Sequence, residues 1–545
     1  MPSNASRKLV DSFAIFTFDL NLGHKCEYIY PPSAFTAQQL EAIAMLSFPD
    51  SQSANSNNCD CVYTFNHRLN VHHAKELVLP IKSKQNPPEQ FVQCYVYFRQ
   101  FEDQTKIRGY YQKSFVIISS YSDKFTNADD MLRLARSVGN KYYLAEEVGC
   151  GREVLVDAFE HIDEFGYSRR RTTSDLSGKP SPISSTKQLD LSPPSSPSHS
   201  TNTIDTLYSL FEGMWHLWEA VMVGLPILLY APGDPDICSR CVIAISNLTP
   251  PVEYHGDIRP FLSIFDSDYS SFKSADLRSC IVGVTSPMAF AQLTSSFALI
   301  VIISNVPTDT DPALSSFIRV ATSPSGSMFI SDSISSVSSG TRTHVASLAS
   351  MFSTVESGYR LALSSDALNL SKKIVTGLHG GDSMISNRVN RRMIQRHFSL
   401  LTRDFLIPFV EYITTDSSRL SSALFGDTPF VKTFKASVFI SQQSVGIGRN
   451  LSQLSREKLR SLYSAFLKTR SFRVWLRNSQ EKANKESISL HADLIAKSVT
   501  ADKVLWMSLV ERERGIETIK RLMTWLGPDS DLHACLSSTL SLLEQ

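Results

Sequence analysis

Residues 207–231 read LYSLFEGMWHLWEAVMVGLPILLYA, and this stretch decides the fold class. Its large apolar residues recur at steps of three and four, which predicts a helix that is buried on most sides. Gly224 stands where a helix end needs a positive φ, and Pro226 stops the helix from continuing. The apolar run 227–231 is short enough to be a strand covered on both faces. A buried helix followed at once by a buried strand predicts an α/β layer with a mainly parallel sheet.

More apolar segments follow this strand. Residues 242–248 and 261–265 are predicted as strands, each followed by a polar loop, HGDIRP at 255–260 and FDSDY at 265–269. Segments 281–290 and 297–303 would complete the sheet. Open α/β sheets present their binding loops at the carboxyl ends of strands, so these two polar loops are candidate contact loops.

The pattern before residue 163 is different. Residues 13–18 and 26–30 flank a turn at Gly23 and predict a hairpin, and Thr36 can cap a helix that ends at Pro49. Strands are predicted at 62–69, 92–99 and 114–120 from their β-branched and aromatic content. A helix with one apolar face follows, capped by Asn127. This order predicts an α+β lobe.

Two serine-rich segments separate the apolar regions. Residues 164–203 have almost no large apolar side chain, so they cannot bury enough surface to offset the entropy of ordering. They are predicted to be a disordered linker, and residues 307–360 a serine-rich insertion. Candidate phosphorylation sites in the linker are Ser174 after three arginines, and Ser181, Ser192 and Ser196, each before a proline. A serine-rich linker also contains such patterns by chance.

The C-terminal part, residues 361–545, is predicted to be helical. A helix over 389–405 would end at Pro408, a second covers 459–467, and a third includes 504–509. The first carries arginines outside its apolar side: Arg388, Arg391, Arg392, Arg396 and Arg403. These form a solvated face, or they contact an acidic partner or anionic lipid.

Composition bounds the class of protein. A chain of 545 residues predicts two to four domains, and a formal net charge of +1 gives none of the basic excess of a nucleic-acid-binding protein. No apolar run approaches the roughly 20 residues of a transmembrane helix, and the first 20 residues lack a signal-peptide pattern. We therefore expect a cytoplasmic protein. The nine cysteines are an odd number spread over the chain, which predicts reduced thiols rather than a disulfide framework.

Motifs for a chemical active site are weak. The phosphate loop GxxxxGK[ST] and the nucleophile motif GxSxG do not occur, and HGGD at 379–382 is better explained as a turn. His72 and His73 near Glu76 lack the order of a zinc-protease helix, and neither CxC at 59–61 nor CxxC at 238–241 has a partner pair for zinc. We expect no catalytic residue, no metal and no cofactor.

Several blocks resemble DENN-domain proteins of class six. The resemblance is carried by segments in the expected order: FTFDLNLGHKCEYIYPP (16–32), YVYFRQFED (95–103), RGYYQKSFVIIS (108–119), LWEAVMVGLPILLYAP (217–232), CVIAISNLTPPVEYHGDIRPFLSIFDSDY (241–269), RRMIQRHFSLLTRDFLIPF (391–409) and LRSLYSAFLKTRSFRVWL (459–476). The resemblance implies a longin-like uDENN lobe at 10–163, a central α/β DENN module at 204–306 and a helical dDENN part at 361–545.

The resemblance also implies a function. Members of this family are guanine-nucleotide exchange factors for Rab GTPases, which implies a Rab partner in endosomal recycling, peripheral membrane association through the GTPase, and no nucleic-acid partner. The alternatives are a catalytically inactive DENN-type trafficking scaffold that binds a small GTPase and, more distantly, an unrecognised hydrolase.

The candidate contact surface lies in a cleft between the two lobes. Its residues come from the polar loops of the central module and from the hairpin after Gly23: Asp257, Arg259, Asp266, Asp268, Tyr269, Glu27 and Tyr28. Arg259 has a second interpretation, as an internal partner of Asp257 or Asp266.

Overall fold

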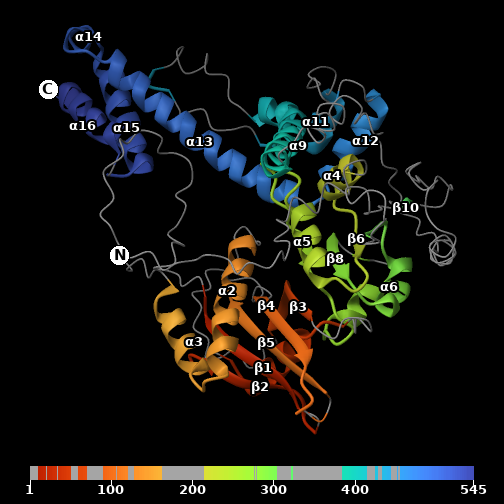
Figure 1. The fold of residues 1–545 in the computed structure, drawn as a ribbon. Coiled ribbons are helices and arrows are strands. Elements are labelled where there is room, and N and C mark those ends of the chain that lie inside the picture. Colours follow the sequence, from red (N-terminus) through yellow and green to blue (C-terminus); the bar gives the residue numbers. More distant parts are fainter. Residues whose placement is uncertain are drawn as a thin grey trace.

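A computed structural model describes residues 10–50 without 20, 33 and 34; 59–69; 90–120 without 106 and 108; 128–162; and 214–303 without 275, 276 and 278. It also describes 321–322, 383–413, 424–426, 433–442, 451 and 455–544 without 529. These residues form a sheet lobe, a central α/β module and a helical C-terminal part (Figure 1). This mixed architecture confirms the predicted fold class.

The first lobe is one antiparallel sheet with helices on both faces. Its strands are β1 (Ser12–Asp19), β2 (Gly23–Tyr30), β3 (Cys59–Leu69), β4 (Gln90–Glu102) and β5 (Tyr110–Ser119), in the order β2-β1-β5-β4-β3. Helix α1 (Ala37–Leu46) packs on one face, while α2 (Ala128–Glu146) and α3 (Gly151–Glu160) pack on the other. The hairpin and three strands occur where they were predicted, whereas α3 was missed.

The start of α1 follows its capping signal. The Thr36 hydroxyl accepts from the Gln39 N–H at 3.3 Å, and the Gln39 side chain accepts from the Thr36 N–H at 2.9 Å. This reciprocal pair satisfies two of the N–H groups that a helix start leaves without partners.

The central module is a mainly parallel sheet between helices. It contains α4 (Met214–Val223), β6 (Ile227–Tyr230), α5 (Pro235–Ser246), β7 (Asp257–Arg259), η4 (Tyr269–Lys273), β8 (Cys280–Val284), α6 (Pro287–Leu293), η5 (Thr294–Ser296), β9 (Leu299–Ile302) and β10 (Ala321–Thr322). The strand order is β10-β9-β6-β8-β7, and only β10 is antiparallel to its neighbour. Gly224 ends α4 with a φ of 72°, as the sequence predicts.

Two predicted strands of this module are wrong. Residues 242–246 are the second half of α5, whose start is set by the Asp234 side chain accepting from the Ile237 N–H at 2.9 Å. α5 is buried along nearly its whole length, so its apolar run could not be told from a buried strand. Residues 261–265 are not a strand either, and the edge strand β7 lies inside the predicted loop 255–260.

The C-terminal part consists of α9 (Ser383–Ile413), α11 (Ala436–Gln442), α12 (Arg456–Phe466), α13 (Arg470–Ser498), α14 (Ala501–Leu505), α15 (Leu509–Leu526) and α16 (Asp531–Glu544). Pro408 was predicted to end the first helix but lies inside α9. The adjacent Phe409 is buried and stacks on Phe439 at 4.2 Å, and this packing offsets the missing backbone hydrogen bond. The predicted third helix is divided, because Ser508 caps the start of α15.

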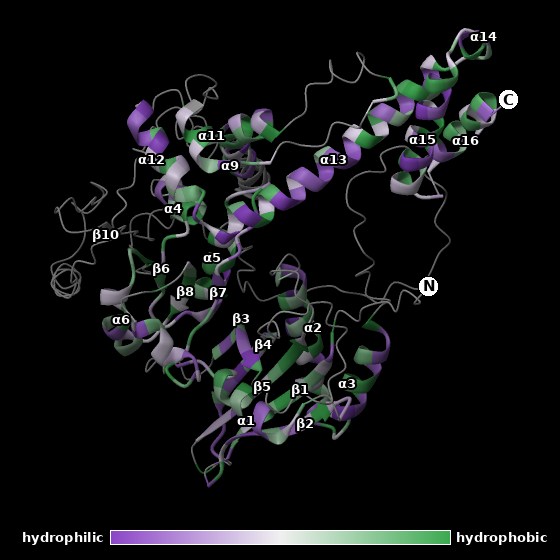
Figure 2. Cartoon of the chain, turned by 180° about the vertical axis from the view of Figure 1, so that it is seen from behind, coloured by the Kyte–Doolittle hydropathy of each residue, from purple (hydrophilic) through white to green (hydrophobic). Residues whose placement is uncertain are grey.

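A single hydrophobic core extends from the first lobe through the central module to α9, α12 and the start of α13. Trp218 of α4 is fully buried at its centre and donates its indole N–H to the Thr402 hydroxyl of α9 at 2.8 Å. A separate core joins the end of α13 to α15 and α16. Figure 2 shows hydrophilic residues along much of α13 between these two cores.

Several predictions lie outside the described residues. They are the linker 164–203 with Ser174, Ser181, Ser192 and Ser196, the insertion 307–360 apart from β10, the residues His72, His73 and Glu76, and the HGGD segment 379–382. Within the described part of the chain, no helix combines the length and hydrophobicity needed to cross a bilayer.

The Trp218–Thr402 hydrogen bond generates a stability prediction. Replacing Thr402 with valine keeps the side-chain shape but leaves the buried indole N–H without a partner, which should lower the free energy of unfolding by about 1–3 kcal/mol. Urea unfolding of both proteins measures this loss. The control is Thr524→Val, where the exposed hydroxyl only contacts the Lys520 carbonyl; equal effects of the two changes would contradict the role of Thr402.

Candidate functional site

The candidate site lies at the seam between the first lobe and the central module, where α5 packs along β3. The Asn66 amide of β3 donates to the Ile258 carbonyl of β7 at 2.8 Å, and the rings of Tyr63 and Phe261 meet edge to face at 5.0 Å. At the other end of the seam, Arg240 of α5 pairs with Asp129 of α2 at 3.0 Å. The two lobes are therefore held together by polar and apolar contacts along the whole seam.

Arg259 is the central charge of the seam and is only 1% exposed. Its guanidinium lies 3.0 Å from Asp257, 2.5 Å from Asp268 and 3.7 Å from Asp266. Asp268 also pairs with Arg68 at the end of β3, at 2.9 Å, so one carboxylate joins the two lobes. The arrangement is the internal pairing that the sequence left open as the second interpretation of Arg259.

Aromatic rings complete the environment of this arginine. The guanidinium lies 4.8 Å from the centroid of Phe91 in the first lobe and 5.5 Å from that of Phe272 in the central module. Contacts of this kind stabilise a cation that has lost its water. Arg259 is thus enclosed by three carboxylates and one ring of the central module and by one ring of the first lobe.

The pKa values at the seam follow from burial and from these charges. Burial lowers the pKa of Arg259, but Asp257, Asp266 and Asp268 raise it overall. Burial raises the pKa of Asp266, with Arg259 acting in the opposite direction. His67 is buried close by, and burial together with Arg259 lowers its pKa to about 4, so it is neutral at pH 7.

The loop FDSDY, residues 265–269, has an inner and an outer side. Asp266 and Tyr269 face inward, where the Asp266 carboxylate accepts from the Asp268 N–H at 2.8 Å and the Tyr269 hydroxyl donates to Gln292 at 3.2 Å. Phe265 faces outward with 53% of its surface exposed. Phe265 was not predicted as a contact residue, because a phenylalanine that ends an apolar run looks like part of the core.

The first-lobe candidates are not adjacent to this loop. Glu27 and Tyr28 lie on β2, the edge strand farthest from β3, with β1, β5 and β4 in between. Glu27 is exposed and pairs with Lys113 at 2.8 Å, while Tyr28 packs beneath the Arg152 guanidinium of α3. The structure brings Asp257, Arg259, Asp266, Asp268 and Tyr269 together. It leaves Glu27 and Tyr28 at the opposite edge of the sheet.

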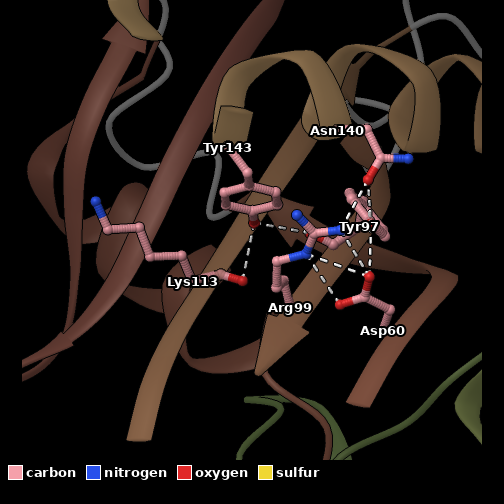
Figure 3. Close-up of polar contacts among 6 residues, drawn as sticks. All are labelled: Asp60, Tyr97, Arg99, Lys113, Asn140 and Tyr143. Atoms are coloured by element: carbon pink, nitrogen blue, oxygen red, sulfur yellow. Dashed lines mark hydrogen bonds and ion pairs between the residues drawn. The ribbon is translucent and has the colours of Figure 1, made fainter. Parts of the chain in front are cut away.

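A second polar cluster occurs on the α2 face of the same sheet (Figure 3). Arg99 donates to Asp60 at 2.8 Å and to Asn140 of α2 at 2.9 Å, and it lies 4.9 Å from the centroid of the Tyr143 ring. The Tyr97 hydroxyl also bonds to both Asp60 and Asn140. Sequence reasoning missed this cluster, because it depends on Asp60 standing opposite Arg99 in the β3–β4 register. Its donors and acceptors satisfy one another, which indicates a structural role.

Cysteine and histidine do not assemble a site at the seam. Cys238 and Cys241 are buried on α5, and Cys59 and Cys61 are half-buried on β3. Over the described part of the chain, no three His, Cys, Asp or Glu side chains are placed to hold a metal ion.

Comparison with known proteins identifies relatives over most of the chain. The protein DENND6A of Mus musculus is 25% identical over 536 residues, covering 92% of this chain and 80% of that protein. The DENND6 homolog of Dictyostelium discoideum is 28% identical over 330 residues, covering 50% of this chain and 43% of that protein. DENND6B of Homo sapiens is 26% identical over 315 residues, about half of each chain. No protein-family model matches the chain.

The burial of Arg259 generates the first prediction for this site. Arg259→Ala would leave Asp266 buried without its cation, which should cost about 3–5 kcal/mol of folding free energy. The control Arg133→Ala removes an exposed pair with Asp130 and should cost under about 1 kcal/mol. Denaturant unfolding measures both, and an Arg259 variant as stable as the control would show that the pairing is not structural.

Asp50 generates a pH prediction. Its carboxylate accepts from the Ser263 hydroxyl across the seam at 2.5 Å, and burial raises its pKa from 3.8 to about 6. Because the folded state binds this proton more tightly than the unfolded state, the charged form costs stability above pH 6 and the cost is relieved as the pH falls. From pH 7 to pH 5 the wild type should gain roughly 1 kcal/mol relative to Asp50→Asn.

The measurement is a pair of unfolding curves at several pH values. Asp502→Asn, at an exposed position of α14, serves as the control for the loss of a carboxylate. A constant difference between the wild type and Asp50→Asn would mean that Asp50 does not titrate in this range.

Proposed function

We propose that this chain, a homologue of the class-six DENN proteins over 92% of its length, is a guanine-nucleotide exchange factor for a Rab-family GTPase. The observation that carries the proposal is the combination of this homology with two lobes held in one fixed arrangement by the seam. Two surfaces that are rigidly joined can bind the two switch segments of a GTPase at the same time.

Exchange requires binding and no covalent chemistry. An exchange factor binds the nucleotide-free GTPase more tightly than the loaded one, and linkage then lowers the affinity of the GTPase for nucleotide by the same factor. The bound factor holds the switch segments away from their contacts with Mg²⁺ and phosphate. The functional part of the chain is therefore a protein interface, of about 800 Å² on each partner.

We place the centre of this interface on the outer rim of the seam. Phe265 supplies an exposed aromatic anchor, and Asp257, which pairs with Arg259 and is partly exposed, supplies a charge. Interfaces of this kind concentrate their binding energy in aromatic anchors. Arg259, Asp266, Asp268 and Tyr269 act on the interface indirectly, because they hold the loop that presents Phe265.

Glu27 and Tyr28 belong to an outer part of the proposed interface. Four strand spacings separate β2 from β3, which amounts to roughly 19 Å. A patch of about 800 Å² is roughly 30 Å across, which exceeds the span from β3 to β2. Removing the Glu27 charge should act mainly on the association rate and its salt dependence.

The cellular setting is the finer part of the proposal. We place the exchange reaction in endosomal recycling, with the chain in the cytoplasm and recruited to endosomes. The second candidate function is a DENN-type scaffold that binds the GTPase without accelerating exchange, since a fold can persist without its activity.

Release of a fluorescent guanine nucleotide from a panel of Rab GTPases tests the proposal. The expected result is catalytic acceleration for one or a few members of the panel by the full chain. Binding to a nucleotide-free Rab without acceleration would identify the scaffold, and the absence of both binding and acceleration over the panel would overturn the proposal.

Phe265 gives the matching mutational prediction. Phe265→Ala should lower kcat/KM for exchange at least tenfold, equivalent to about 1.4 kcal/mol or more of lost interface energy, with the melting temperature unchanged. The control is Leu490→Ala on α13, because Leu490 is 56% exposed and lies in the C-terminal helical part, away from the seam. Equal activities of the two variants would remove Phe265 from the interface.

A further inference from the structure

The groove between α11 and α12 has the chemistry of an anion-binding site. Its volume is about 540 Å³, and it is lined by Ser437, Ile440 and Ser441 of α11 and by Arg460, Ser464 and Lys468 from α12 and its end. Two cations and three hydroxyl groups line this groove together with apolar side chains, and none of the described residues that line it carries a carboxylate. Cations combined with hydroxyl donors are the groups that recognise phosphate.

The cations of the groove are available for a ligand. Arg460 and Lys468 are exposed, and neither forms an ion pair with any residue that the structure describes. Their surroundings are strongly basic, because residues 455–480 contain seven lysines and arginines and one glutamate, whereas the whole chain has a formal net charge of +1. A concentration of positive charge in an otherwise balanced chain attracts a polyanionic surface.

The corner between α14 and α15 exposes a second, apolar feature. Four large side chains within six residues are strongly exposed: Leu505 by 75%, Trp506 by 90%, Leu509 by 79% and Val510 by 58%. The corner is structured, since Ser508 and Glu511 form a capping box and Arg512 donates to the Val504 carbonyl at 2.7 Å. These side chains are therefore held out from the protein by a fixed backbone.

The two features lie on the same side of the molecule. In Figures 1 and 2, α11, α12 and α14 all lie away from the five-stranded antiparallel sheet, and α13 runs between them. The 29 residues of α13 span about 43 Å, so the groove and the corner lie far apart. Only an extended ligand can contact both.

We propose that the helical C-terminal part binds the surface of an anionic membrane, with the groove taking a lipid phosphate headgroup and the Trp506 corner entering the interfacial layer. Basic residues near a bilayer gain about 1 kcal/mol each from anionic lipid, and tryptophan favours the layer between water and hydrocarbon. This contact places the chain directly on lipid, independently of the GTPase and of exchange activity. The basic charge complements an anionic bilayer, and the apolar corner fits a bilayer better than a phosphorylated protein.

The test is co-sedimentation of the full chain with vesicles of phosphatidylcholine alone and of phosphatidylcholine containing phosphatidylserine and phosphoinositide. We expect binding only to the anionic vesicles. Arg460→Glu/Lys468→Glu should lower the partition coefficient at least about tenfold. The control Arg133→Glu/Lys141→Glu makes the same charge change at exposed positions of α2 and should bind like the wild type.

The apolar corner is tested with a separate control variant and with tryptophan fluorescence. Trp506→Ala should lower the partition coefficient about fivefold, whereas Ile107→Ala, at an apolar residue of the first lobe that is 93% exposed, should not. Vesicle binding should shift the tryptophan emission to shorter wavelength, and Trp506→Phe should remove that shift. Thermal melting checks that each variant is folded.

Two results would overturn the proposal. One is failure of the folded chain to sediment with anionic vesicles, including the case in which it is retained on a phosphopeptide resin instead. The other is sedimentation of the groove variant or of the corner variant at the level of its control.

Discussion

The structure depends on one buried cation, the Arg259 guanidinium. A charge that is 1% exposed is tolerated only when it is paired, and here Asp257, Asp266 and Asp268 supply the pairing. Because Asp268 also binds Arg68 and Phe91 lies against the guanidinium, the same cation fixes the first lobe against the central module. The central module itself supplies the three carboxylates, and the first lobe joins the cluster through Phe91 and through Arg68 on Asp268.

This constraint matters for a protein that acts by binding. A partner gripped by two lobes gains affinity when the lobes are already in place, since less motion is lost on association. Trp218 and Thr402 extend the same rigidity from the central module to α9. The proposed exchange surface and the proposed membrane-facing helices are therefore parts of one packed body, although the end of α13 with α15 and α16 has its own core.

Local signals made part of this fold predictable. Gly224 and Pro226 separate α4 from β6, and Thr36 with Gln39 starts α1, because each signal acts within a few residues. Burial on all sides removed the periodicity of α5 and made it look like a strand. The prediction that Pro408 ends the helix was wrong for a different reason. The low helix propensity of proline was overridden by the aromatic packing around Phe409. The similarity to DENND6A over 92% of the chain agrees with the resemblance that several separate blocks carry.

The sequence predicted which residues form the candidate site in the central module, but not how they are arranged. The loops 255–260 and 265–269 do meet around Arg259, but the contacts that the first lobe adds through Arg68 and Phe91 come from residues far away in the sequence. The distance of Glu27 from the seam likewise follows from the order β2-β1-β5-β4-β3, which depends on pairings between remote strands. An inward carboxylate and an outward phenylalanine, Asp266 and Phe265, are adjacent in the chain. The pairing of Arg259 holds Asp266 inward and leaves Phe265 outward, so it decides which of the two a partner can contact. Arg259, the charge that looks most functional in the sequence, therefore stabilises the fold.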